Sequence, residues 1–349
     1  MSSGPPTAPP SAASSARDTL ARTTNALSIV PVAGLTVLFA AGVKVPEYLV
    51  YAPFVASLAF LGVPHGAVDH LVPARLTPCL STAASVLAVG LVYLVLAFSY
   101  LALWFFAPVA AFALFIALTW FHWGQGDLWY LLTISPADRS MTPASRLLTL
   151  FVRGGLPMFV PLLAFPEVYS QVAVSASGLF GAGISPEAWI FDSAFRVIAG
   201  TVFVGFTLLS LVIGYRSSTT LHDAWRVYVA ETLLLAAYFA LVPPVLAVGA
   251  YFCLWHAPRH IARLMLLDKG SAAALERGRI GPAAANFVRD SAPLTLAAIV
   301  LLAGLYLALP ESASGLQSLL GVYLVAISLL TLPHVAVVCW MDFRQGLWR

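Results

Sequence analysis

The sequence predicts an all-α polytopic membrane protein, a bundle of about ten transmembrane helices with eight as the lower bound. Hydrophobic residues make up 60% of the 349 residues and charged residues only 9%, whereas about a quarter of the residues in soluble domains are charged. Several uncharged runs reach about 20 residues, the length of helix that crosses the hydrocarbon core of a bilayer. We therefore expect a multi-pass protein of the cell membrane.

The N-terminal residues differ in composition from the rest of the chain. Residues 1–25 are rich in Ser, Ala, Pro and Thr and poor in large apolar side chains, which is typical of segments that stay disordered. We predict a disordered cytoplasmic tail over residues 1–25 and a single transmembrane domain over residues 26–345. A removable signal peptide is the alternative for the N-terminal region, but Ala26–Val43 would serve equally as a first span.

The individual spans follow from the apolar runs. Two long segments each hold two spans: Leu76–Gly126 divides near Trp104–Pro108, and Val227–Leu266 divides at Pro243-Pro244, because proline interrupts helical hydrogen bonding. Arg153 lies inside one further, weaker span. The weaker span is Arg146–Phe165. The other five spans are Ala26–Val43, Tyr48–Pro64, Val197–Tyr215, Ala292–Pro310 and Ser312–Met341.

The distribution of basic residues predicts the orientation. With ten spans and an interior N-terminus, both termini are cytoplasmic, and of the Lys and Arg residues only Lys44 and Arg196 fall outside. This asymmetry follows the positive-inside rule. The formal net charge is only +3 and the basic residues are spread along the chain, which argues against nucleic acid as a partner and leaves membrane lipid as the expected neighbour.

Six of the seven histidines lie in or beside predicted spans. An ionisable residue at membrane depth costs a few kcal/mol and often marks function. A single membrane histidine is usually an interhelical hydrogen-bonding residue, but five at one depth indicate a shared site. We expect His70 to be structural and His222 to be solvated or to contact a helix start. The predicted topology places the other five in the cytoplasmic half of their spans: His65, His122, His256, His260 and His334.

The spacing of two of these histidines suits metal binding. His256 and His260 are four residues apart, so both imidazoles lie on one helix face and are able to ligate one ion, with Pro258 kinking the turn between them. An all-imidazole donor set suits Fe, Zn, Cu or Ni rather than Mg or Ca.

Asp69 and Asp127 follow the first two histidine motifs, and Glu231 begins the span before the helix of His256 and His260. Asp69, Asp127 and Glu231 are placed to accept the second N–H of a ligating imidazole, which would fix its tautomer. Glu231 has a structural alternative as a partner of Arg226 or a residue near its helix start. Arg259 is expected to pair with a carboxylate or to face the lipid headgroups.

Taken together, the histidine motifs resemble those of the Brp/Blh family of membrane β-carotene dioxygenases, in order and approximate position, over roughly residues 50–345. The resemblance implies cleavage of the central 15,15′ double bond of β-carotene by dioxygen at a non-haem Fe(II), giving two all-trans-retinal. The motifs that carry it are Pro64-His-Gly-Ala-x-Asp69, His122-x-Gly, Trp255-His-x-x-Arg-His260 and Leu332-Pro-His334.

Carried over by motif, the iron ligands of the family fall on His65, His122, His256 and His260. The resemblance implies no catalytic residue beyond the metal ligands, and it leaves the role of His334 unassigned. The aromatic residues that flank the histidines would then line a tunnel for a polyene, although packing and anchoring explain most membrane aromatics. The retinal product suggests a functional link to a retinal-binding rhodopsin.

Other classes of membrane protein also contain buried histidines. The sequence has no adjacent His-His pair, which argues against a membrane desaturase or hydroxylase. Lys44 and Lys269 are the only lysines and lie in predicted loops, so no lysine is placed to form a rhodopsin Schiff base. A haem-binding protein and a proton-coupled transporter that uses the histidines and Glu231 stay open as alternatives.

Overall fold

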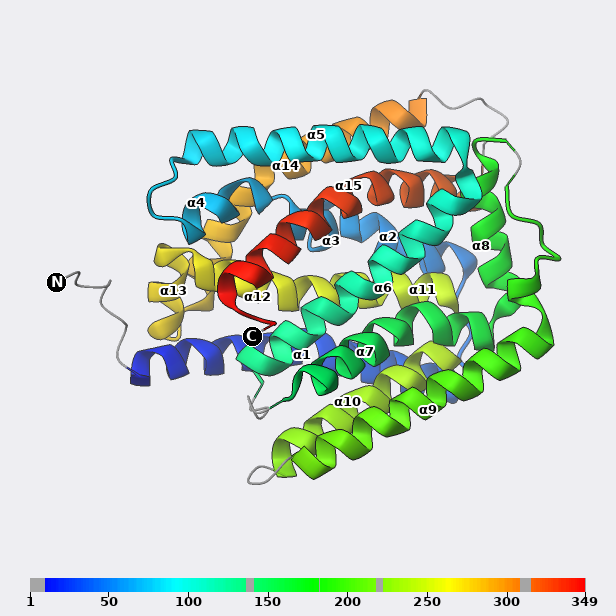
Figure 1. Ribbon diagram of the computed structural model, residues 1–349, viewed down its shortest axis with the longest axis horizontal. Coiled ribbons are helices and arrows are strands. Elements are labelled where there is room, and N and C mark those ends of the chain that lie inside the picture. The colour runs from blue at the N-terminus through cyan, green and yellow to red at the C-terminus, as the bar shows by residue number, and fades with distance from the viewer. Residues whose placement is uncertain (1–9, 136–140, 182, 218–221, 308–314, 349) are drawn as a thin grey trace.

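The computed structural model describes residues 10–135, 141–181, 183–217, 222–307 and 315–348, and this part of the chain forms helices and no β-strand. Most of the long helices run roughly along one direction in Figure 1 and enclose shorter helical pieces near the middle of the bundle. The long helices are α1 (Pro10–Ala40), α5 (Thr82–Phe106), α6 (Pro108–Thr133), α7 (Pro143–Ala164), α9 (Ser193–Ser217), α10 (His222–Leu241), α14 (Ile280–Leu307) and α15 (Leu316–Gln345).

The shorter elements complete the bundle. Helices α2, α3 and α4 with the 3-10 turn η1 form one discontinuous segment, and α11, the π-helical turn η3 and α12 form one continuous helix. Their bounds are α2 (Glu47–Ala59), α3 (Gly62–Gly66), η1 (Asp69–Leu71), α4 (Val72–Leu76), α8 (Pro166–Gly178), η2 (Trp189–Phe191), α11 (Pro244–Tyr251), η3 (Phe252–His256), α12 (Ala257–Leu267) and α13 (Lys269–Glu276).

Eight helical segments of the described chain are long and apolar enough to cross a membrane. They contain α1, the α2–α4 segment, α5, α6, α7, α9, α14 and α15. The prediction of an all-α, multi-pass protein is thus confirmed. The other two predicted spans correspond to α10 and to the α11–α12 helix, so a count of ten and the side of the termini stay predictions. Pro310 and Ser312, where two predicted spans meet, lie outside the described residues.

Both predicted helix breaks are confirmed. Helix α5 ends at Phe106 and α6 begins at Pro108, while α10 ends at Leu241 and α11 begins at Pro244. Proline suits the first turn of a helix because its missing N–H would have no intrahelical partner there.

The N-terminal segment differs from the predicted tail. Helix α1 begins at Pro10, inside the range that the composition predicts to be disordered, while residues 1–9 lie outside the description. Its alanines favour a helix, and Ala16 and Leu20 are buried in a cluster that includes Leu275 of α13. Tertiary packing therefore orders a segment whose own side chains are small.

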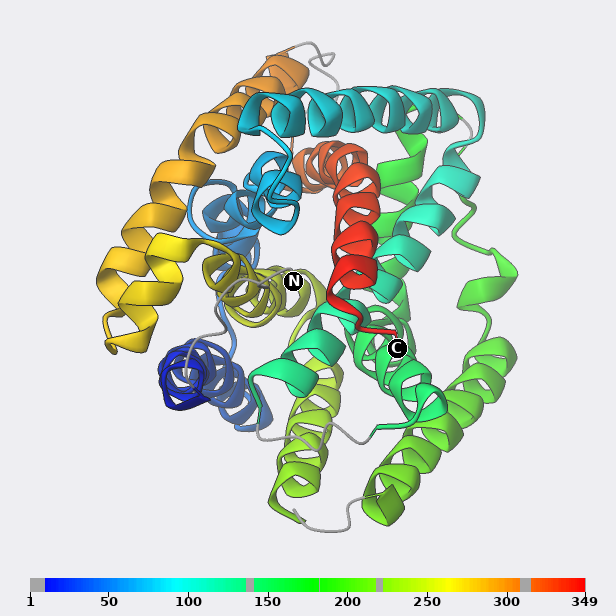
Figure 2. The ribbon, with the colours of Figure 1, turned by 60° about the vertical axis from the view of Figure 1, so that its left-hand side comes forward.

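The second predicted span is a broken helix. Helix α2 ends at Ala59, and the chain re-forms a short helix from Gly62 to Gly66. A Cβ atom on Gly62 would lie 2.7 Å from Cε1 of Phe252 and 2.7 Å from the Ser57 carbonyl oxygen, so only glycine permits this approach. Figure 2 shows the pieces of residues 47–76 (blue) enclosed by α5, α12, α14 and α15. The break therefore carries the His65 motif into the bundle interior.

Candidate metal centre

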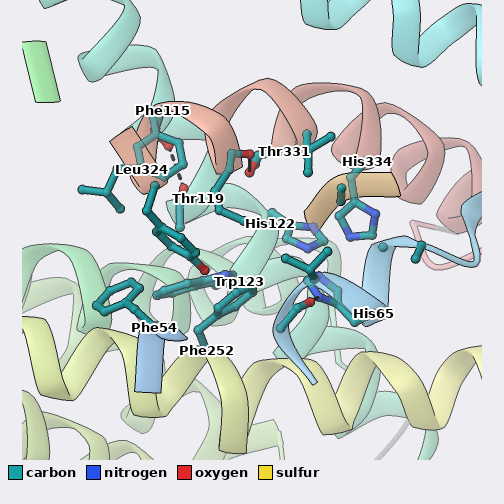
Figure 3. Close-up of a pocket in the computed structure, with 18 of the residues that line it drawn as sticks. Phe54, His65, Phe115, Thr119, His122, Trp123, Phe252, Leu324, Thr331 and His334 are labelled. Carbon is teal, nitrogen blue, oxygen red and sulfur yellow. Dashed lines mark hydrogen bonds between the residues drawn. The ribbon is translucent and has the colours of Figure 1, made fainter. Parts of the chain in front are cut away.

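Five imidazoles from five helical elements meet in the interior: His65 from α3, His122 from α6, His256 from η3, His260 from α12 and His334 from α15. All are between 2% and 7% exposed. The ring of His65 is central, because its centroid lies 4.9 to 6.3 Å from the other four. Figure 3 shows His65, His122 and His334 converging at one end of a cavity. The predicted convergence of these five histidines is observed.

Hydrogen bonds orient two of the rings toward a common centre. Nδ1 of His65 bonds to the Gly62 carbonyl oxygen, which accepts, so Nδ1 carries the hydrogen and Nε2 keeps its lone pair. Nδ1 of His122 lies 3.2 Å from Oε1 of Gln125, whose amide nitrogen donates to Asp342. Because that donation fixes the amide orientation, Oε1 accepts from His122, and Nε2 keeps its lone pair and lies 3.1 Å from Nε2 of His256.

His334 is oriented in the same way by a carboxylate. Its Nδ1 donates to Oδ2 of Asp69 at 2.7 Å, and Oδ2 also accepts from the Tyr93 hydroxyl. Nε2 of His334 is buried and has no hydrogen-bond partner among the described residues. A carboxylate that accepts from the far nitrogen of an imidazole is the usual support of a metal-ligating histidine. His334 is thus placed as favourably as the four histidines that the family resemblance selects.

The remaining two histidines come from one distorted helix. The π-helical turn Phe252–His256 precedes Pro258; a proline ring clashes with the carbonyl four residues earlier, and a widened turn relieves that clash. The ring centroids of His256 and His260 are 6.3 Å apart, with nearly parallel planes. The predicted distortion at Pro258 therefore takes the form of a π turn that presents both rings to the same interior space.

The donor atoms fit a metal ion. The ligand atoms of His65, His122 and His334 lie within 4.8 Å of one another, as do those of Asp69, His260 and His334. Nε2 of His122 lies 3.1 Å from Nε2 of His256, and two nitrogens that each bind one ion at about 2.1 Å, at a right angle, lie about 3 Å apart. Nε2 of His260 has no partner in the described structure. A neutral imidazole set of this kind suits iron or another first-row transition metal.

The buried negative charge of Asp69 also favours a bound cation at this site. Asp69 is 2% exposed, its Oδ1 has no hydrogen-bond partner, and no Lys or Arg pairs with it among the described residues. A buried carboxylate without a compensating cation is costly. A divalent ion beside His334 would supply that missing positive charge.

The other two predicted carboxylates have a different role from the one expected. Asp127 and Glu231 do not support imidazoles; they form a buried ion-pair quartet with Arg153 and Arg259, with N–O distances of 2.5 to 3.1 Å. All four side chains are at most 5% exposed. Trp255 also donates to Asp127. Of the three predicted carboxylates, only Asp69 therefore accepts a hydrogen bond from an imidazole N–H. The alternative that Arg259 pairs with a carboxylate is confirmed.

The quartet fixes the helices that carry the histidines. It joins α6, α7, α10 and α12, and Arg259 stands between His256 and His260 in the sequence. The Arg259 guanidinium also lies 4.0 Å from the Trp255 ring centroid. Arg153 was not predicted as a functional residue, because in the sequence it only interrupts a span. The signal available was a charged residue in the middle of an apolar run.

A cavity of about 660 Å³ adjoins the histidines and is lined mainly by apolar side chains, within the usual size range of small-molecule sites. His65, His122 and His334 line one region, and Phe54, Phe115 and Leu324 lie at the other end of the view in Figure 3. One face of α15 follows the cavity from His334 to Leu320, and 14 helical residues rise about 21 Å. His70 also lines the cavity, and its Nδ1 donates to the Ala67 carbonyl oxygen at 2.9 Å.

Comparison with known proteins identifies the family. The family model described as beta-carotene 15,15'-dioxygenase matches residues 56–342. The chain is 45% identical to "Probable beta-carotene 15,15'-dioxygenase Blh" of Halobacterium salinarum, over 95% of each chain. It is 30% identical to "Probable beta-carotene 15,15'-dioxygenase Brp" of the same species over 90% of each chain, and 22% identical to "Beta-carotene 15,15'-dioxygenase" of an uncultured marine bacterium over 59% of this chain and 66% of the relative. No solved structure matches. This chain therefore belongs to the β-carotene 15,15′-dioxygenase family of enzymes.

Proposed function

We propose that this enzyme cleaves the central 15,15′ double bond of β-carotene with dioxygen at an Fe(II) centre inside the cell membrane. Each carbon of the broken double bond receives one oxygen atom of dioxygen, so one carotene and one dioxygen give two all-trans-retinal. The observation that carries the proposal is the cluster of five buried imidazoles that opens onto an apolar cavity, in a chain of this family. Both features favour this reaction over haem binding or proton-coupled transport.

The iron would be held by His65, His122, His256 and His260, with His334 as an additional ligand supported by Asp69. The buried, partnerless Nε2 atoms of His260 and His334 support this assignment, as does the orientation of the His65 and His122 rings by their Nδ1 partners. When bound, Fe(II) supplies the binding and activation of dioxygen.

The protein would position the polyene and exclude water. The apolar wall formed by α15 extends about 21 Å from the level of His334, and aromatic residues such as Phe115 and Trp123 line the same cavity. A rigid polyene would lie along this wall with one terminal ring at the far end of the cavity. The position of that end would then decide whether the central double bond lies beside the histidines. Regiospecificity would then depend on the length of the cavity, because a symmetrical chain offers no polar group to recognise.

The arrangement in the cell follows from the same reasoning. We propose ten spans with both termini in the cytoplasm and one catalytic domain, which covers residues 26–345 and also includes the N-terminal part of α1 that packs against α13. The substrate would be dissolved in membrane lipid, and the retinal produced would be available to a retinal-binding rhodopsin.

Expression in cells that accumulate β-carotene tests the reaction. Wild-type protein should bleach the cells and form retinal, whereas His256→Ala, at equal abundance in the membrane, should leave the carotene intact. If carotene persists beside abundant, iron-loaded wild-type protein, this function is refuted.

A further inference from the structure

We propose that the carotenoid enters the cavity sideways from the bilayer, through an opening between α5 and α14. This inference rests on the proposed function for the identity of the substrate. The opening itself follows from the exposure of the cavity wall, independently of the histidines.

The exposed part of the wall is confined to two helices. Among the described residues that line the cavity, the exposed ones all belong to α5 or α14, while the other wall residues are buried or intermediate. We call these exposed residues the mouth residues. They are Val86, Gly90, Pro293, Leu294, Ala297 and Leu301.

On α5 the mouth residues lie beside buried wall residues. Val86 is 43% exposed and stands four residues before Gly90, so the two share one helix face. Val89, on the same stretch, also lines the cavity but is 5% exposed. The helix surface therefore passes from the outside of the bundle into the cavity within one turn.

On α14 the mouth residues form a second stripe. Leu294 and Leu301 are 45% and 57% exposed, and Ala297 lies between them. Positions 294, 297 and 301 are separated by three and four residues, which places them on one face. Figure 2 shows α5 (cyan) above and α14 (orange) to the left of the pieces of residues 47–76, both on the outside of the bundle. Two apolar faces thus border the same opening.

The chemistry of the mouth selects an apolar ligand. None of its six residues carries a charge or a side-chain hydrogen-bonding group, and both helices are apolar enough to cross a membrane. The opening therefore meets hydrocarbon rather than water, and Gly90 and Ala297 keep it wide because their side chains are the smallest. A rigid polyene dissolved among lipid tails passes such an opening without losing any hydration.

Bulky substitutions at the mouth test the proposal. A Cβ atom on Gly90 meets nothing within 4 Å, so Gly90→Trp is compatible with folding, and Ala297→Trp narrows the opening from the other helix. Gly205→Trp is the matched control, because Gly205 is an exposed glycine of α9 with the same open surroundings and does not line the cavity. Gly90→Ala controls for the loss of glycine itself.

The measurement is the rate at which each purified variant takes up β-carotene from liposomes without dioxygen, followed by retinal formation when dioxygen is admitted. We expect Gly90→Trp and Ala297→Trp to slow uptake about tenfold, which corresponds to a barrier raised by about 1.4 kcal/mol, with unchanged iron content. Both controls should match the wild type. If both mouth variants take up β-carotene as fast as the wild type, the proposed opening is refuted. If the mouth variants take up β-carotene slowly but the wild type forms no retinal, the proposed reaction is refuted and the opening is supported.

Discussion

Asp69→Asn is the most informative single change, because it removes a buried charge while keeping the shape of the side chain. Asp69 accepts from His334 and lacks a Lys or Arg partner among the described residues. An ion that binds on the far side of the His334 ring, about 2.1 Å from its nitrogen, would lie roughly 7 Å from the carboxylate oxygen that accepts from the same ring. Their attraction is then about 5 kcal/mol at an effective dielectric constant of 20, part of which is offset by the cost of burying the carboxylate.

We therefore expect Asp69→Asn to weaken metal binding about 10- to 100-fold, the range found when such supporting groups are lost. Competition with a chelator in purified protein measures this affinity. Tyr93→Phe is the matched control, since it removes a hydrogen bond to the same carboxylate and leaves the charge in place. The metal-free Asp69→Asn variant should be at least as stable as metal-free wild type, because an uncompensated charge is gone. Equal metal affinity in wild type and Asp69→Asn would refute the reasoning.

Three further changes probe the scaffold. Glu231→Gln should destabilise the protein by about 3–5 kcal/mol, because it breaks a buried ion-pair quartet; an unchanged unfolding temperature would contradict this role. Gly154→Ala should prevent close packing of α6 and α7, since its Cβ would lie 2.9 Å from the Gly124 nitrogen, and a stable, active variant would argue against that contact. Burial alone would raise the pKa of Asp268, but hydrogen bonds from Ser271 together with the charges of Arg75 and Arg289 hold the pKa below its ordinary value. The stability that this carboxylate gives to α13 is then present above pH about 4 and lost as the pH falls through the lowered pKa, so unfolding temperatures should become less pH-sensitive in acid for Asp268→Asn.

The sequence predicted the fold class because hydrophobic run length is a direct consequence of bilayer thickness. It also located the breaks at Pro108 and Pro244, since proline acts through its own backbone. It did not predict the break before Gly62, which depends on the close approach of Phe252 from a distant helix. Local composition likewise failed for residues 10–25, where burial of Ala16 and Leu20 decides the outcome.

The candidate site was predicted in its histidines and less well in its supporting residues. The five histidines could be predicted from their spacing and motif order, because only a few types of side chain bind a metal ion. The partners of those side chains depend on which helices become neighbours, which no spacing encodes. Asp127 was therefore assigned to an imidazole although it pairs with Arg153 and Arg259, and Gln125, which orients His122, was not anticipated.

The measurement that tests the central claim most directly is the product balance of purified, Fe(II)-loaded protein given β-carotene and oxygen-18-labelled dioxygen. Central cleavage at the histidine site predicts two retinal molecules for each carotene consumed, each carrying labelled oxygen, and no product from metal-free protein. Unequal fragments, unlabelled aldehydes or full activity without metal would contradict it.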